Sequence, residues 1–251
     1  MTRRSADPTT RIAIWSGPRN LSTAMMRCFE ARGDCGVVDE PFYGAYLKAT
    51  GVDHPMREEI IASMPTDVEQ IAEAMAGPAP GGEPVFYQKQ MPHHLYLSGA
   101  PLEWMKACRH AILIRAPERM IASFDAKRPA PDLNELAIPQ MDRIDSDIAD
   151  LTGAPPPVIE AEDVRANPAG MMRSLCAALD IPFKPAMLRW PAGARANDGI
   201  WGAHWYRSVE TSTGFAPPAG EAPELAPHLA EAAAAARPAF ERLQARKLGP
   251  V

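Results

Sequence analysis

The feature that most constrains the fold is a series of five short apolar runs spaced along the chain. The runs are Ile12 to Trp15, Gly36 to Val38, Val85 to Tyr87, Ala111 to Ile114, and Val158 to Ile159. Their residues are mostly β-branched or aromatic, and the runs are continuous rather than alternating, which is typical of strands covered on both faces. The runs therefore predict a mainly parallel sheet.

Helix-like segments lie between and after these runs. They span Leu21 to Arg32, Arg57 to Met64, Asp67 to Ala76, Pro101 to Ala107, Pro117 to Lys127, and Pro168 to Leu179. Strands that alternate with helices indicate an α/β fold of the doubly wound type, with right-handed crossovers. We expect a single domain over residues 1–251, with a flexible stretch at 1–10 and an amphipathic C-terminal helix at 223–246.

Two segments do not fit this alternation. Residues 127–139 are interrupted by prolines, and we expect a surface excursion there that can act as a lid. Residues 182–220 are irregular and rich in aromatic side chains. The first of the two segments is therefore a candidate lid over a site.

Composition excludes several classes of protein. A net charge of -5 argues against a nucleic-acid binder, which needs a basic surface. No run approaches the roughly 20 apolar residues that cross a bilayer, and Met1 to Arg11 is too polar for a secretory signal. The four cysteines form no CxxC pair, which fits a reduced set and indicates neither disulfides nor a metal site. We expect a cytoplasmic protein that does not bind membranes.

The loop after the first apolar run is a candidate anion site. Residues 16–23, Ser-Gly-Pro-Arg-Asn-Leu-Ser-Thr, connect a strand to the start of a helix. Free backbone N–H groups and the positive end of the helix dipole favour a phosphate or sulfate there. The loop is not a Walker A sequence, since it lacks the Gly-Lys pair. A plain strand–turn–helix connection capped by Ser or Asn is the alternative.

This loop resembles the 5′-phosphosulfate loop of sulfotransferases that use 3′-phosphoadenosine 5′-phosphosulfate (PAPS), in particular the tyrosyl-protein, carbohydrate and bacterial branches. The resemblance implies a sulfotransferase fold, which is a P-loop NTPase-like parallel sheet with helices on both faces. It also implies that Arg19 contacts the phosphosulfate and its bridging oxygen. The remaining contacts come from Gly17, Pro18, Asn20, Leu21, Ser22 and Thr23. Leu21 occupies a position where many members have Gly.

A second motif follows the fourth apolar run. Arg115 begins the stretch Arg-Ala-Pro-Glu-Arg-Met-Ile-Ala-Ser, which ends at Ser123. It resembles the 3′-phosphate motif of the same family, with the Arg-to-Ser spacing preserved and Ala116 in place of the usual Asp. The alternative is that Arg115 pairs with a surface acid and that Ser123 simply lies on a helix. Two phosphate motifs in the family's order, each after a strand, favour the nucleotide site.

The resemblance also suggests which residues carry out the chemistry. Glu40 matches the catalytic Glu of tyrosyl-protein sulfotransferases, and Lys89 matches a Lys beside the transferring sulfuryl group. Met91 occupies the position of the catalytic His of the cytosolic branch. His93 is therefore the second candidate for the base, and His94 is expected to pack at a helix start or to face solvent.

The sequence thus predicts sulfuryl transfer from PAPS to a hydroxyl or amine of a small-molecule acceptor, with 3′,5′-adenosine bisphosphate as product and no metal. Two alternatives remain open. One is a P-loop kinase-like enzyme, which normally needs the Gly-Lys pair and a Mg²⁺ ligand. The other is a catalytically inactive nucleotide-binding protein with the sulfotransferase fold.

Overall fold

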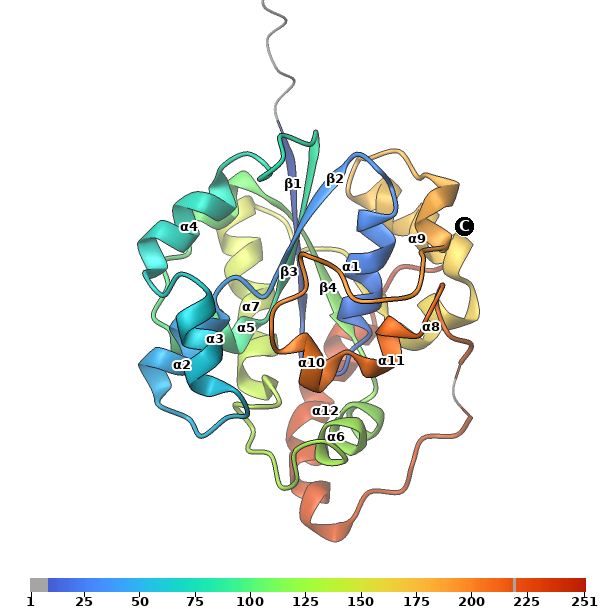
Figure 1. The fold of residues 1–251 in the computed structure, drawn as a ribbon. Helices are drawn as coiled ribbons and strands as arrows, with labels where there is room; N and C mark the ends of the chain where they lie inside the picture. Colours follow the sequence, from blue (N-terminus) through green and yellow to red (C-terminus); the bar gives the residue numbers. More distant parts are fainter. Residues whose placement is uncertain (1–8, 219) are drawn as a thin grey trace, which may run out of the picture.

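The sheet predicted from the apolar runs is present in the computed structural model, which describes residues 9–218 and 220–251. Five parallel strands lie in the order β2-β3-β1-β4-β5 (Figure 1). They are β1 (Thr10–Ser16), β2 (Cys35–Asp39), β3 (Val85–Gln90), β4 (Arg109–Ile114) and β5 (Val158–Glu160). The α/β prediction is confirmed, and each strand extends its apolar run by one to three residues.

Helices fill the connections between the strands. The α-helices are α1 (Ser22–Glu30), α2 (Tyr43–Thr50), α3 (Arg57–Ser63), α4 (Val68–Ala76), α5 (Pro92–Leu97), α6 (Pro117–Asp125), α7 (Ile138–Thr152), α8 (Ala161–Ala166), α9 (Pro168–Ala178), α10 (Gly202–Trp205), α11 (Arg207–Glu210) and α12 (Ala230–Gln244). The 3₁₀ helices are η1 (Glu103–Ala107), η2 (Pro185–Leu188) and η3 (Pro227–Leu229). Five of the six predicted helices are α-helical, and the sixth, at residues 101–107, is the 3₁₀ helix η1.

Both faces of the sheet are buried, which explains why the strand sequences are continuously apolar. Ile12 and Ile14 of β1 pack on one face, in a core shared with α1 and α9. Ala13 and Trp15 pack on the other face, in a core shared with α4, α5, α7, η1 and α12. All four side chains are fully buried. Alternation along the strand thus separates two apolar cores rather than core and solvent.

The C-terminal helix is shorter than predicted. It begins at Ala230 and not at residue 223, and η3 precedes it. Pro223 and Pro227 account for the difference, because a residue that precedes a proline is disfavoured in the α conformation. The predicted flexible stretch at 1–10 falls mostly outside the described residues, but Thr10 already begins β1.

The segment between α6 and α7 is only partly a surface excursion. Arg128 on this segment pairs with Glu135 and also donates to the backbone oxygen of Asp53. Leu136 and Ala137 are fully buried at its end. The end of the segment is therefore packed inside the protein, where the backbone oxygen of Leu136 lies close to Gly17 of the loop after β1.

The strand order indicates the carboxyl ends of β1 and β4 as the position for a ligand site. From β1 the chain crosses to β2 at one edge of the sheet, and from β4 it crosses to β5 at the opposite edge. In open parallel sheets, ligands bind where neighbouring strands connect in opposite directions. Figure 1 shows α6, α10 and α11 at this end of the sheet. None of the described helices is both long and apolar enough to span a bilayer.

One buried histidine predicts acid sensitivity of the fold. His110 on β4 accepts a hydrogen bond from the indole N–H of Trp15 at 3.0 Å, and its other ring nitrogen lies 2.8 Å from the backbone oxygen of Met105. Both contacts are satisfied only by the neutral ring, and burial lowers the pKa of His110 to about 4. The unfolded state takes up a proton near the ordinary pKa of about 6.5, whereas the folded state does so only near 4. Stability therefore falls as the pH drops from about 6.5 toward 4.

We expect the free energy of unfolding to fall by about 2 kcal/mol between pH 7 and pH 5 on account of His110. Urea titrations at several pH values measure this slope. The variant His110→Gln lacks the titrating group. Its free energy of unfolding should therefore fall by about 2 kcal/mol less than that of the wild type over the same pH range. An unchanged slope in the variant would show that other groups cause the acid sensitivity.

Candidate active site

The loop after β1 holds Arg19 at the carboxyl end of the sheet. Arg19 and Leu21 both have positive φ angles, of 59° and 73°, so the chain turns sharply before α1. None of the described side chains caps the N-terminus of α1, which leaves its first N–H groups for a ligand. Leu21 adopts the left-handed conformation that glycine adopts most easily. The loop therefore turns at this position although it carries Leu where many members have Gly.

The two predicted phosphate motifs meet in space. Arg19 donates from Nε to the hydroxyl of Ser123 at 3.2 Å, and Arg115 donates to the backbone oxygen of Arg19 at 2.8 Å. Burial and the nearby charge of Arg115 lower the pKa of Arg19. The two guanidinium groups therefore form a cationic region between β1 and β4.

A further arginine, not singled out from the sequence, joins this region. Arg165 on α8 lines the same cavity, and burial and the charge of Arg115 lower its pKa. Its buried Nε has no hydrogen-bond partner among the described residues. Glu162 is the acid nearby, and it pairs with Arg115 at 3.1 Å and with Arg119 at 3.7 Å. The Glu162 carboxylate thus faces the guanidinium groups of Arg115, Arg119 and Arg165, so the region keeps a net positive charge.

Glu40 and Lys89 lie together at the ends of β2 and β3. Lys89 Nζ is 2.5 Å from Glu40 Oε1 and 2.8 Å from Asp39 Oδ1. Burial raises the pKa of Glu40, and the charge of Asp39 raises it further, while Lys89 opposes both effects. Burial acts to lower the pKa of Lys89, but the two carboxylates outweigh it and raise that pKa well above its usual value.

Both predicted histidines are buried. His94 Nδ1 lies 3.6 Å from Glu40 Oε2, and its ring stacks on Tyr43 with centroids 4.3 Å apart. The expectation that His94 packs at a helix start is met, and the solvent alternative is wrong, since His94 is 3% exposed. His93 lines the cavity, and burial lowers its pKa to about 3.

These groups surround one cavity of about 370 Å³. All the site residues predicted from the sequence line it except Gly17, which borders a smaller neighbouring cavity. Its lining includes the three arginines of the cationic region, Arg19, Arg115 and Arg165, together with Glu40 and Lys89. The lining also includes a set of aromatic rings in contact with one another, here called the aromatic cluster: Tyr43, Tyr46, His54, His93, Phe124 and Trp205.

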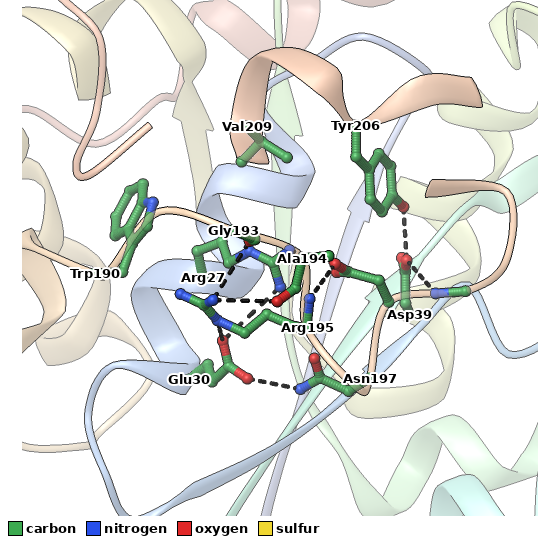
Figure 2. A network of polar contacts seen from close by, with 12 residues as sticks. Arg27, Glu30, Asp39, Trp190, Gly193, Ala194, Arg195, Asn197, Tyr206 and Val209 are labelled. Carbon is green, nitrogen blue, oxygen red and sulfur yellow. Dashed lines mark hydrogen bonds and ion pairs between the residues drawn. The ribbon is translucent and has the colours of Figure 1, made fainter. Parts of the chain in front are cut away.

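The irregular segment at residues 190–216, here called the covering segment, closes one side of the cavity. It contributes Trp201, Trp205 and Tyr206 to the lining. Figure 2 shows how polar contacts fasten this segment to α1. Arg27 binds Asp198 at 2.5 Å, Asn197 donates to Glu30 at 2.9 Å, and Arg195 pairs with Glu30 at 3.2 Å.

The chain matches the family described as "Sulfotransferase domain" over residues 10–247. The chain belongs to the sulfotransferase family. Solved structures with the same fold include the sulfotransferase domain of an olefin synthase from Synechococcus PCC 7002, at 17% identity and a TM-score of 0.52, covering 93% of this chain and 96% of that one. A sulfotransferase from Alicyclobacillus acidocaldarius has 15% identity and a TM-score of 0.57, covering 95% of this chain and 97% of that one.

Two curated relatives of this sulfotransferase-family chain come from Arabidopsis thaliana. They are named branched-chain-amino-acid aminotransferase-like proteins 2 and 1, and they are 39% and 40% identical to it over 207 residues. The match covers 82% of this chain but only 36% and 37% of those proteins. The chain therefore spans little more than a third of the length of these relatives.

Proposed function

We propose that the chain transfers a sulfuryl group from PAPS to a small-molecule acceptor. The observation that carries the proposal is the single cavity in which the cationic region around Arg19 and Arg115 meets the Glu40–Lys89 pair. Clustered arginines and an uncapped helix start suit a nucleotide with several phosphate groups. The carboxylate and ammonium beside them suit a proton transfer coupled to a group transfer.

The cationic region fits PAPS in its charge and in its donors. The N–H groups at the start of α1, with Ser22 and Thr23, would hold the 5′-phosphosulfate. Arg115 and Ser123 would hold the 3′-phosphate. Arg165 is an additional candidate there, because its buried Nε lacks a partner among the described residues. A phosphate would oppose both the burial and the repulsion from Arg115 that lower the pKa values of Arg19 and Arg165.

Each residue then has a defined part in the transfer. Glu40 takes the proton from the acceptor hydroxyl or amine as the new bond to sulfur forms. The bond between sulfur and the leaving phosphate oxygen breaks, and its electron pair stays with 3′,5′-adenosine bisphosphate. Arg19 stabilises the charge that develops on that oxygen, and Lys89 stabilises the sulfuryl oxygens. Positioning and charge stabilisation supply most of the catalysis, as in phosphoryl transfer.

His93 is a weaker candidate for the base than Glu40. A histidine with a pKa of about 3 stays neutral at physiological pH, but it binds a proton weakly. Glu40 has a raised pKa, which makes its carboxylate a stronger base than an ordinary one. The neutral ring of His94 stacks on Tyr43 and Tyr46 and faces Glu40, so it suits orienting the carboxylate.

The aromatic cluster in the cavity lining would hold the acceptor. Its rings offer flat apolar walls. Arg128, whose charge acts on Tyr46 and His54, is paired with Glu135. We therefore expect an acceptor with a flat or apolar body and no negative charge. Acceptors that carry a carboxylate or phosphate should react poorly, because the carboxylates of Glu40 and Glu135 line the cavity and would repel them.

Transfer of labelled sulfur tests the proposed function. The protein is incubated with PAPS carrying ³⁵S and a panel of phenols, aliphatic alcohols, amines and carboxylated phenols. We expect labelled product from uncharged or cationic acceptors, with or without EDTA. Bisphosphate binding without transfer to any acceptor would favour the catalytically inactive alternative. Metal-dependent turnover of ATP would favour the kinase-like one.

A further inference from the structure

The ammonium group of Lys89 makes all of its hydrogen bonds within the protein. Its three N–H bonds go to Asp39 Oδ1 at 2.8 Å, Glu40 Oε1 at 2.5 Å and the hydroxyl of Tyr206 at 2.7 Å. An ammonium group has three donors, so none is left for a substrate oxygen. Lys89 must therefore release one of these partners before it can contact a sulfuryl group.

The hydroxyl of Tyr206 likewise makes all of its hydrogen bonds with neighbouring side chains. Its hydroxyl donates to Asp39 Oδ2 at 2.6 Å and accepts from Trp201 Nε1 at 3.0 Å, as well as from Lys89. Its ring lies under Lys89, with the centroid 5.0 Å from Nζ. Burial raises the pKa of Tyr206 well above its usual value, so the hydroxyl keeps the proton that it donates to Asp39. Figure 2 shows this contact between the covering segment and the end of β2.

The two carboxylates around Lys89 are not equivalent. Asp39 receives hydrogen bonds from Lys89, Tyr206 and the backbone N–H of Gly199, and its side chain is 1% exposed. Glu40 lines the cavity, whereas Asp39 is not part of the lining. Glu40 receives its hydrogen bond from Lys89, and it has the weaker contact to His94 at 3.6 Å. Glu40 is therefore the partner that Lys89 can release at the lower cost.

We propose that Asp39 and Tyr206 are positioning residues that hold Lys89 while it exchanges Glu40 for the sulfuryl group. The exchange frees the Glu40 carboxylate at the moment when its basicity is needed. Asp39 stays as the counter-ion that keeps Lys89 charged throughout. Because Tyr206 belongs to the covering segment, Lys89 is fully fixed only when that segment is in place. This inference rests on the proposed function, and it adds two residues that the resemblance does not assign.

The variant Tyr206→Phe tests the inference, because it keeps the ring and removes the hydroxyl. We expect kcat to fall by about 10- to 100-fold, the effect of losing hydrogen bonds to charged groups, with the KM for PAPS nearly unchanged. The control is Tyr96→Phe, which removes a similar hydroxyl contact, from Tyr96 to Asp147 at 2.8 Å, outside the cavity. The control should keep wild-type kcat.

A second variant gives a readout that a purely structural role would not move. The charge of Asp39 raises the pKa of Glu40, so Asp39→Asn should shift the acidic limb of the kcat/KM profile to lower pH. An unshifted limb, or a Tyr206→Phe variant with kcat within about twofold of wild type, would overturn the inference.

Lysine NMR separates this inference from the proposed function, since it needs no acceptor. In protein labelled with ¹⁵N-lysine, the buried Lys89 ammonium should give a slowly exchanging signal that is missing in Lys89→Met. Tyr206→Phe should broaden or abolish this signal, and Tyr96→Phe should leave it in place. A signal unchanged in Tyr206→Phe would refute the positioning role even if wild type transfers sulfur. Absence of transfer by the wild type, with the signal lost in Tyr206→Phe, would refute the proposed function and the exchange with a sulfuryl group, but it would support the hold of Tyr206 on Lys89.

Discussion

The variant Glu40→Gln is expected to lower kcat by about 10³-fold, within the range attributed to general bases. Gln has nearly the shape of Glu but cannot accept the acceptor proton. Binding of 3′,5′-adenosine bisphosphate should stay nearly unchanged, because Glu40 is not among the residues assigned to the phosphates. In the wild type, the acidic limb of kcat/KM should lie above the ordinary glutamate pKa, since burial raises the pKa of Glu40. Steady-state kinetics over a range of pH measure both quantities.

The matched control is Glu103→Gln, at an exposed glutamate that pairs with Lys106 on the surface. This variant should keep wild-type kinetics. If Glu40→Gln turns over at a near-normal rate, Glu40 is not the base, and His93→Gln becomes the variant to examine. A Glu40→Gln variant that also loses bisphosphate binding would indicate a local folding defect.

The variant Arg19→Ala is expected to lower kcat by about 10²- to 10³-fold, the usual effect of removing one donor that stabilises developing charge. Arg19 belongs to the first motif, and its side chain donates a hydrogen bond to Ser123 of the second. Its loss should therefore weaken bisphosphate binding as well. Transfer kinetics and titration calorimetry separate the two effects.

The variant Arg19→Lys refines this prediction. Lysine keeps the charge but lacks the planar fork of donors, so it should restore binding more than it restores kcat. Equal recovery of both would indicate that charge alone matters at this position. Wild-type kcat in Arg19→Ala would remove Arg19 from the transfer step.

The sheet was predictable because its strands are buried on both faces, which leaves continuous apolar runs in the sequence. Some helices were missed although the signal was present. In α7 the buried residues Ile138, Met141, Ile144 and Ile148 follow a helical spacing. Pro139 masked this pattern, although proline is favoured in the first turn of a helix. Conversely, Pro223 and Pro227 interrupt the amphipathic pattern, which is why the C-terminal helix begins only at Ala230.

The site was predictable where its residues follow strands in short motifs. The loop at 16–23 and the Arg115–Ser123 motif converge because parallel strands place their carboxyl ends at one edge. The covering segment was not predictable in the same way. Tyr206 reaches Asp39 across 167 positions of sequence, and Asp198 reaches Arg27 across 171. Such contacts depend on tertiary packing and leave no local pattern.

The most direct measurement of the central claim is a thermal-shift titration with 3′,5′-adenosine bisphosphate, with 5′-AMP and Mg-ATP as controls. A ligand that binds only the folded state raises the melting temperature, by about 5 °C or more at 100 times its Kd. We expect this shift with the bisphosphate for the wild type. In Arg115→Ala the Kd for the bisphosphate should rise about 10- to 100-fold, while the response to 5′-AMP stays the same. No shift with the bisphosphate, or a shift with Mg-ATP alone, would contradict the account.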